Sequence, residues 1–129
     1  MASVVDKKVI SEPFSNEAEL VRAVWDYDVD GGAVGSLDLL EAQGNVAVLL
    51  KAAVVKDPVL SGGALTLSVG ESAGSELINA WPKANMDGDE HKIGLVPLKL
   101  TAGEKVGMSI AVASATRGKI EFIFEVLRV

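Results

Sequence analysis

The sequence of 129 residues contains no cysteine and a single histidine, and only 5% of its residues are aromatic. The absence of cysteine excludes thiolate nucleophiles, disulfide bonds and zinc sites with cysteine ligands. One histidine, His91, cannot supply the two or three imidazoles that hold the metal of cupin-type enzymes. The sequence therefore offers few of the groups from which active sites are built. We expect no enzyme activity and no cofactor.

Positive charge is also scarce, because 12 basic residues stand against 18 acidic ones and the net charge is −6. The basic residues are scattered, whereas a phosphate-binding surface needs them clustered. No apolar run approaches the roughly 18 residues of a membrane-spanning helix. The first ten residues are too short and too charged for a signal peptide. We therefore expect neither nucleic acid nor a membrane as a partner, and no use of the usual export route.

Short apolar runs separated by glycine-rich turns dominate the chain, a pattern typical of β-strands. The expected strands are Val4–Ile10, Leu20–Tyr27, Ala33–Leu40, Asn45–Val55, Ala64–Val69, Leu95–Leu100, Lys105–Ala113 and Lys119–Leu127. Breaks are expected at Pro58 and at residues 61–63, and only Ser75–Trp81 reads as helical before Pro82 ends it. The pattern predicts an all-β fold, a two-sheet antiparallel, jelly-roll-like sandwich with at most one short helix. Residues 18–129 form this domain, and residues 1–17 form an N-terminal arm.

Two expected strands are apolar on both faces, which usually means that both faces are covered. In the run from Asn45 to Val55, strict alternation places Val46, Val48, Leu50, Ala52 and Val54 on one face. The opposite face then holds Ala47, Leu49, Ala53 and Val55. The cover can be a loop, the N-terminal arm or another subunit. We expect these four residues to form the interface of a homo-oligomer, a dimer or a trimer.

Residues 70–74, Gly-Glu-Ser-Ala-Gly, match the G-x-S-x-G pattern of a nucleophile elbow, with Ser72 as the nucleophile. His91 would have to be the base, with Asp87 or Asp89 as the third member. A true elbow crowns a parallel sheet flanked by helices, and this chain lacks such helices. Because Gly and Ser are also common turn residues, a plain turn is the favoured interpretation.

Residues 26–31, Asp-Tyr-Asp-Val-Asp-Gly, match the opening of a calcium-binding loop. The twelfth position of such a loop should be a bidentate Glu, but here it is Leu37. We therefore expect a solvated turn in which Asp26, Asp28 and Asp30 lie on one side. Trp25 and Trp81 could form a sugar-stacking platform, but two tryptophans in a sandwich are more often core or interface residues.

A longer stretch resembles a known family. Residues 23–35 run from a strand with an aromatic-Asp-aromatic stretch into Gly-Gly-Ala, a hydrophobic residue and a further Gly. The pattern is similar to that of the capsid decoration, or cement, proteins of tailed bacteriophages. The similarity continues through Val46–Val55, the turn at residues 61–64 and the strand from Leu65 to Gly70. It covers about half of the chain. The arm at residues 1–17 and a long acidic loop from Trp81 to His91 depart from the family pattern.

The resemblance implies a jelly-roll subunit on the outer surface of a virion, made in the host bacterial cytoplasm. It would clamp neighbouring subunits of the major capsid protein without catalysis. The net negative charge also suits a layer outside the shell better than one against packaged DNA. The arm, with Lys7, Lys8, Val9, Ile10 and Phe14, is expected to contact the capsid by pairing with an exposed strand. A fibre or receptor-binding β-sandwich that recognises carbohydrate is the alternative, and a hydrolase at Ser72 is a distant third.

Overall fold

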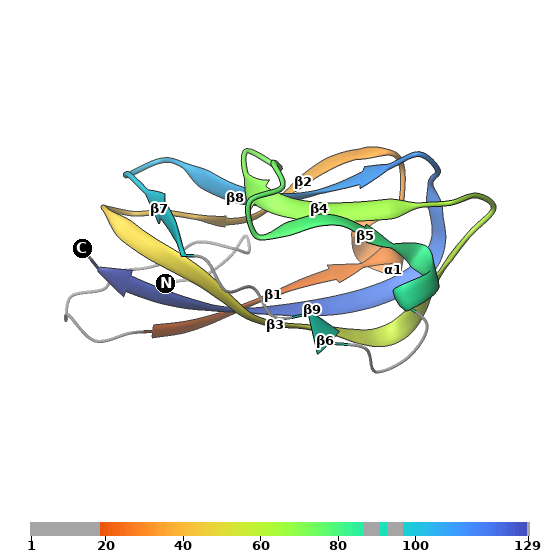
Figure 1. The fold of residues 1–129 in the computed structure, drawn as a ribbon, viewed down its shortest axis with the longest axis horizontal. Coiled ribbons are helices and arrows are strands. Elements are labelled where there is room, and N and C mark those ends of the chain that lie inside the picture. The colour runs from red at the N-terminus through yellow and green to blue at the C-terminus, as the bar shows by residue number, and fades with distance from the viewer. Residues whose placement is uncertain (1–18, 87–90, 93–96, 129) are drawn as a thin grey trace.

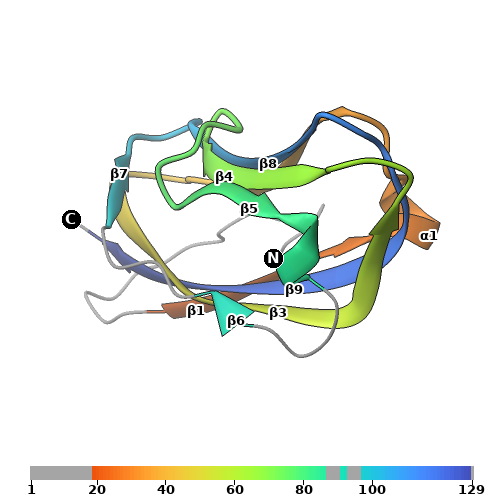
Figure 2. The same cartoon turned by 45° about the vertical axis from the view of Figure 1, so that its right-hand side comes forward.

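The structure, a computed structural model, describes residues 19–86, 91–92 and 97–128. These residues form two antiparallel sheets packed face to face (Figure 1 and Figure 2). The strands are β1 (Glu19–Asp26), β2 (Gly35–Glu41), β3 (Val46–Ser61), β4 (Thr66–Glu71), β5 (Ile78–Pro82), β6 (His91–Lys92), β7 (Leu98–Leu100), β8 (Lys105–Ala111) and β9 (Ala115–Arg128). The helices among the described residues are the short α1 (Tyr27–Asp30) and a 3-10 turn, η1 (Lys83–Asn85).

The strand order identifies the architecture. One sheet has the order β1-β9-β3-β6, with β7 also paired to β3, and the other has the order β2-β8-β4-β5. The chain crosses repeatedly between the two layers, so strands that are neighbours in a sheet come from distant parts of the sequence (Figure 1). This is the double-sheet jelly roll. The predicted all-β, two-sheet antiparallel sandwich with at most one short α-helix is confirmed.

The core lies between the two sheets and follows the alternation of each strand. Leu65, Leu67 and Val69, which alternation places on one face of their strand, are buried. On the long strand β9, Phe122 and Phe124 are completely buried, and their rings stack with centroids 6.3 Å apart. Alternate side chains of a strand point to opposite faces. The residues between them therefore form the outer surface of the sheet.

The predicted helix from Ser75 to Trp81 is wrong, because this segment contributes strand β5. Ile78 and Trp81 are both buried and pair with Val69 and Leu67 of β4. Their spacing of three residues resembles a helical period, but in the structure it arises from a β-bulge. The bulge includes Ala80, which has a φ of 52°. An extra residue in one strand bends it while keeping both flanking side chains in the core.

Strand β3 passes through the predicted break at Pro58 and ends only at Ser61. The pairing with β9 is irregular on both sides of Pro58, and irregular strand positions are where proline is tolerated. Strand β8 ends at Ala111 rather than at Ala113. Uninterrupted alternation would put Val112 on the same face as Ile110, but Val112 has a φ of 75° and is 73% exposed. The left-handed backbone at this position turns the side chain outward.

The two ends of the sandwich carry different loops. Strand β2 begins beside α1 and finishes at the β2–β3 turn, so these features lie at opposite ends (Figure 1). The α1 end also holds the β3–β4 and β8–β9 loops. The other end, hereafter the turn end, holds the β2–β3, β4–β5 and β7–β8 turns. The arm at residues 1–17, with its predicted strand Val4–Ile10, lies outside the described residues.

Candidate functional site

The outer surface of the β1-β9-β3 sheet, hereafter the β9 face, is unusually apolar. Register and burial place the following apolar side chains on it: Leu20, Val24, Ala47, Leu49, Ala52, Val54, Ile123 and Leu127. Leu20 is 67% exposed and Leu127 is 43% exposed, and the other six are half-buried. Pairing brings Leu20 and Leu49 to either side of Glu125, and Ala52 lies beside Ile123. Apolar side chains therefore lie on all three strands of this face, on either side of the charged positions of β9.

This face differs from the predicted one, because β3 contains a bulge at Lys51. Leu50 pairs with Phe124 and Ala52 with Ile123, so β3 advances by two residues while β9 advances by one. The alternation of β3 reverses at that point. Ala47 and Leu49 lie on the β9 face as predicted, but Ala53 and Val55 are buried in the core, at 0% and 1% exposure. The prediction that all four share one outer face is wrong, and Ala52 and Val54 take the places of the other two.

A charged cluster crosses the β9 face. The Glu121 carboxylate accepts a hydrogen bond from Arg22 of β1, and Lys56 Nζ of β3 lies 3.7 Å from its Oε1. Only 8% of the Glu121 side chain is exposed, against 69% for Arg22 and 52% for Lys56. Glu121 pairs with Val24 on one side and Val54 on the other, so its walls are apolar. A carboxylate in such a place needs partners, because an unpaired buried charge is strongly destabilising.

The outer surface of the second sheet, by comparison, carries polar and small side chains. Ser36, Ser109 and Ser68 lie in one row across β2, β8 and β4. The Ser68 hydroxyl accepts a hydrogen bond of 2.9 Å from the Ala80 backbone N–H. In the next row, Gly107 lies beside Gly70. The apolar surplus of the composition is thus concentrated on one side of the sandwich, at the β9 face.

Ser72 lies in a cavity of about 500 Å³ at the turn end, lined also by Ser36, Asp38, Glu71, Ala73, Gly103, Glu104 and Lys105. Its backbone has a φ of 54°, and its N–H donates to the Lys105 carbonyl at 2.9 Å. The turn leads from β4 into the antiparallel strand β5, not into a helix. His91 belongs to the other sheet, where it pairs with Val54. The geometry therefore supplies neither the strand-to-helix elbow nor His91 as a base beside Ser72.

Two carboxylates in this cavity affect each other. The charge of Glu104, followed by partial burial, raises the pKa of Glu71 above its ordinary value. A hydrogen bond of 2.7 Å from the Thr101 backbone N–H lowers the pKa of Glu104. Lys105 Nζ lies 3.4 Å from Asp38 Oδ2, so this ammonium already pairs with a carboxylate. The cavity is an open acidic hollow whose groups mainly hold the β4–β5 and β7–β8 turns together.

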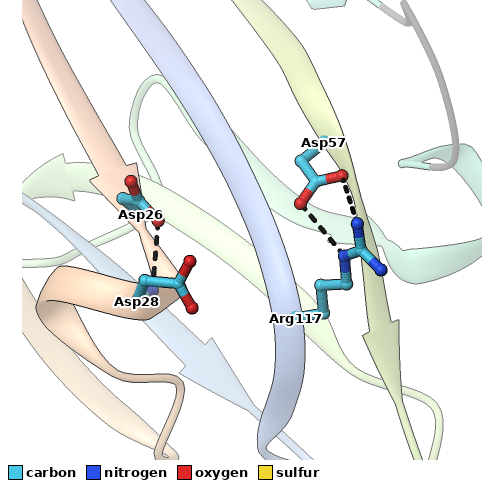
Figure 3. A network of polar contacts seen from close by, with 4 residues as sticks. All are labelled: Asp26, Asp28, Asp57 and Arg117. Atoms are coloured by element: carbon cyan, nitrogen blue, oxygen red, sulfur yellow. Dashed lines mark hydrogen bonds and ion pairs between the residues drawn. The ribbon is translucent and has the colours of Figure 1, made fainter.

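The three aspartates of the calcium-like motif lie at helix α1, and Asp26 is its N-cap. The Asp26 carboxylate accepts from the Asp28 backbone N–H at 3.1 Å, as an N-cap does (Figure 3). Asp30 Oδ2 accepts from the Asp26 backbone N–H at 3.0 Å. Nearby, Arg117 of β9 makes a two-pronged pair with Asp57 of β3 (Figure 3). Over the described part of the chain, no group of three or more His, Cys, Asp or Glu side chains is placed to hold a metal ion.

Both tryptophans belong to the core. Trp25 is 1% exposed and donates a hydrogen bond of 2.8 Å from Nε1 to the Gly31 carbonyl. Trp81 is 2% exposed and pairs with Leu67. Neither indole can serve as a stacking platform for a sugar at the surface. This is the core placement that two tryptophans in a sandwich most often have.

Sequence reasoning missed the charged cluster and half of the apolar face. Arg22 and Glu121 are separated by 99 positions, so only the register of β1 against β9 brings them together. Ala52 and Val54 were assigned to the core, because nothing in the local pattern marks the bulge at Lys51. The alternation of β9, with acidic residues opposite phenylalanines, did indicate which side of that strand faces outward.

Comparisons with protein-family models, curated proteins and solved structures gave no match to this chain. The described residues also contain no helix with the length and apolar character needed to cross a bilayer.

Proposed function

We propose that this chain is a structural virion protein, a decoration or cement protein on the outer surface of a tailed-phage capsid. It clamps neighbouring subunits of the major capsid protein, acts without catalysis or cofactor, and associates with itself as a dimer or trimer. The observation that carries this proposal is the β9 face, on which apolar side chains of three strands surround a set of ion pairs on one side of a jelly roll. The family resemblance of residues 23–35, 46–55 and 61–70 supports the shell as the partner.

Leaving the apolar side chains of the β9 face in contact with water is unfavourable in free energy. Leu20, Leu49 and Ile123 lie on three adjacent strands and are at most half-buried. Burying one large aliphatic side chain completely contributes about 1.5–3 kcal/mol relative to exposure. Monomeric soluble proteins rarely keep large continuous apolar patches, and those that occur usually mark an interface. A second copy placed on this face would cover all three side chains at once.

The charges on the β9 face favour a specific interface over unspecific adhesion. Glu121 and Glu125 are paired within the chain, with Arg22, Lys56 and Lys51, so a partner need not bury an uncompensated carboxylate. Fixed ion pairs also set the orientation in which a second surface can dock. A closed dimer or trimer at a symmetry axis of the shell would satisfy both requirements.

The function is tested by co-sedimentation of the purified protein with phage capsids that lack it. Negative-stain images of these capsids are compared before and after the protein is added. We expect saturable binding and a ring of added density on the outer surface in negative-stain images. Absence of binding to capsids that lack the protein would contradict the proposal. Binding in a glycan array without capsid binding would support the carbohydrate-recognising alternative, which the burial of both tryptophans disfavours.

The test of self-association is the substitution Leu49→Lys, which places a charge in the middle of the β9 face. We expect it to shift the protein toward monomers in light scattering at micromolar concentration. Ser109→Lys is the matched control, because Ser109 lies at the middle of the other outer surface. A wild type that is already monomeric under these conditions would contradict the oligomer.

A further inference from the structure

Strand β1 forms an open edge of its sheet. Among the described strands, it pairs with β9 on one side and with no strand on the other. Its eight residues, Glu19–Asp26, keep an unbroken register with β9 and contain no bulge. An edge strand presents unpaired backbone N–H and C=O groups, and a long, regular edge accepts a further strand readily. The free side of β1 is therefore a place where an extended segment can bind.

The other edges in the described part of the chain carry features by which proteins prevent such pairing. Strand β5 ends in Pro82 and is bulged at Ala80. Strand β2 shifts its register after Asp38, and β6 and β7 are two and three residues long. Strand β1 has no proline and no bulge, and its one charge away from the ends, Arg22, is engaged with Glu121 on the β9 face. The long edge without protection is thus that of β1.

The hydrogen bonds at the end of β1 show which of its backbone groups face the open side. In an antiparallel strand the N–H and C=O of one residue point to the same side, and the side alternates along the strand. The Asp26 N–H donates to Asp30 Oδ2 at 3.0 Å, so it points away from β9. Leu20, Arg22 and Val24 are in phase with Asp26. Their backbone groups therefore face the open side, where an added strand would pair with them.

The segment that fits this edge is the one that precedes it in the chain. Residues 1–18 end directly at Glu19, the first residue of β1, and they include Val4–Ile10. Four of these seven residues are Val or Ile, which favour strands. Residues 11–18, with Pro13, are a connection of ordinary loop length, and strands that follow each other in sequence are usually neighbours. The covalent link also gives the segment an effective concentration of about millimolar at β1, far above that of a separate partner.

The same segment carries the protection that β1 lacks. Asp6, Lys7 and Lys8 lie in the middle of it. Charged side chains, lysine above all, are what natural edge strands use to prevent further pairing. With this segment beside β1, the new edge of the sheet would be charged. Leu20, which is 67% exposed at the start of β1, would also gain a neighbour on its open side.

We propose that Val4–Ile10 adds an antiparallel strand to the open edge of β1 in the same chain, where it pairs with the backbone groups of Leu20, Arg22 and Val24. The sheet then runs from this strand through β1, β9 and β3 to β6. In this arrangement the arm belongs to the sandwich and not to the capsid contact that the resemblance implies. The proposal does not depend on the proposed function, because the edge and the segment belong to one chain.

The first experiment traps the pairing as a disulfide in a chain that has no cysteine of its own. Leu20→Cys is combined in turn with Lys8→Cys, Val9→Cys and Ile10→Cys, and each full-length variant is oxidised at low micromolar concentration. Opposite residues of paired strands bring their Cα atoms within the reach of a disulfide. The control combines Leu20→Cys with Ala2→Cys, which lies in the arm outside the proposed strand.

We expect one of the three pairs to form an intramolecular disulfide about tenfold or more faster than the control, whereas the shorter loop alone accounts for only about twofold. Rates within about twofold of the control for all three pairs would mean that the arm does not pair with β1. Disulfides that form only between chains would assign the edge to the arm of a second copy. Either result would overturn the proposal.

The second experiment measures amide hydrogen exchange by NMR in the wild type and in two full-length variants. Lys7→Pro interrupts the proposed strand, because proline has no N–H to donate, and Ala2→Pro is the matched control outside it. The amides of Leu20, Arg22 and Val24 should exchange slowly in the wild type and in Ala2→Pro, and about tenfold or more faster in Lys7→Pro. The alternate amides of β1, which face β9, are the internal reference. Fast exchange at the three positions in the wild type, or protection that survives in Lys7→Pro, would refute the added strand.

Discussion

The pair between Arg22 and Glu121 should contribute measurably to stability, although Arg22 is largely exposed. Breaking a fully buried pair by removing one partner costs about 3–5 kcal/mol, and breaking an exposed pair costs about 0–1 kcal/mol. Glu121 belongs to the first class, since 8% of its side chain is exposed, and Arg22 to the second, at 69%. Lys56 remains 3.7 Å from the carboxylate when Arg22 is removed. We therefore expect Arg22→Met to lower the free energy of unfolding by about 1.5 kcal/mol, between the two ranges.

A double-mutant cycle with Glu121→Leu isolates the interaction between the two side chains. This second mutation places an aliphatic side chain between Val24 and Val54. In this background Arg22→Met should cost about 0.5 kcal/mol or less, because no buried carboxylate is left without its partner. The coupling energy is then about 1 kcal/mol, within the usual range for residues in contact. The measurement is urea unfolding at a protein concentration low enough to keep all variants monomeric, because Arg22 lies on the β9 face.

The matched control is Lys51→Met, which removes the partner of Glu125 at 3.6 Å. Glu125 is 34% exposed, so this change should cost less than about 0.5 kcal/mol. If Arg22→Met costs no more than Lys51→Met, or if the two mutations of the cycle are additive, the argument that Glu121 depends on Arg22 is refuted.

Three further predictions concern the rest of the molecule. Gly118→Ala should cost about 2 kcal/mol or more in urea unfolding, since the new Cβ would lie 2.9 Å from Trp25 and from Val59 at a φ of 147°; Gly44→Ala, with open space around it, should be near neutral. Glu71→Gln should raise the melting temperature at pH 7, because the charge of Glu104 raises the pKa of Glu71 and so disfavours its charged form in the fold. This rise in melting temperature should disappear below pH 4.5, the ordinary pKa, where Glu71 is protonated anyway. An equal rise at pH 7 and pH 3.5 would contradict this. Ser72→Ala and His91→Ala should each change the free energy of unfolding by less than about 0.5 kcal/mol, and labelling of Ser72 by a serine-reactive probe would contradict the interpretation of Ser72 as a turn residue. Chelator should leave the melting temperature unchanged, and a lower melting temperature with chelator would indicate a bound cation.

The fold could be predicted from sequence because most strands alternate cleanly. Leu65, Leu67 and Val69 share one face of their strand by alternation, as Phe122 and Phe124 do on theirs, and the structure buries all of them. Alternation fails where a strand contains an extra residue, and neither Lys51 nor Ala80 is marked by its residue type. The local pattern is then read with the wrong period or on the wrong face, which explains both the helix predicted at Ser75–Trp81 and the misplaced half of the β9 face.

The candidate site was less predictable than the fold, because it depends on register. The contact between Arg22 and Glu121 requires β1 and β9 to pair with Val24 opposite Glu121. A shift of one residue would place Glu121 opposite a core position and would leave the carboxylate without its guanidinium. Local signals were also ambiguous, since Asp26, Asp28 and Asp30 match a calcium loop. In the structure the Asp26 and Asp30 carboxylates accept backbone hydrogen bonds from Asp28 and Asp26 at the start of α1.

The bulge at Lys51 gives a decisive comparison between Leu49 and Ala53. Uninterrupted alternation places both residues on the β9 face, so Leu49→Lys and Ala53→Lys should then behave alike and only disrupt self-association. The structure separates them, because Leu49 is half-buried outside and Ala53 is completely buried in the core. Leu49→Lys should therefore give a folded monomer with near wild-type stability. Ala53→Lys should lower the free energy of unfolding by about 3 kcal/mol or more, since it forces an unpaired ammonium and added volume into the core.

Circular dichroism melts and light scattering on the two variants measure both effects. Val54→Lys serves as the control for position, because Val54 is the neighbour of Ala53 but points outward after the bulge. It should resemble Leu49→Lys rather than Ala53→Lys, although a lysine there lies beside the paired Glu121. If Ala53→Lys is folded and Val54→Lys is not, then β3 keeps its alternation through Lys51, and the β9 face consists of Ala47, Leu49, Ala53 and Val55 after all.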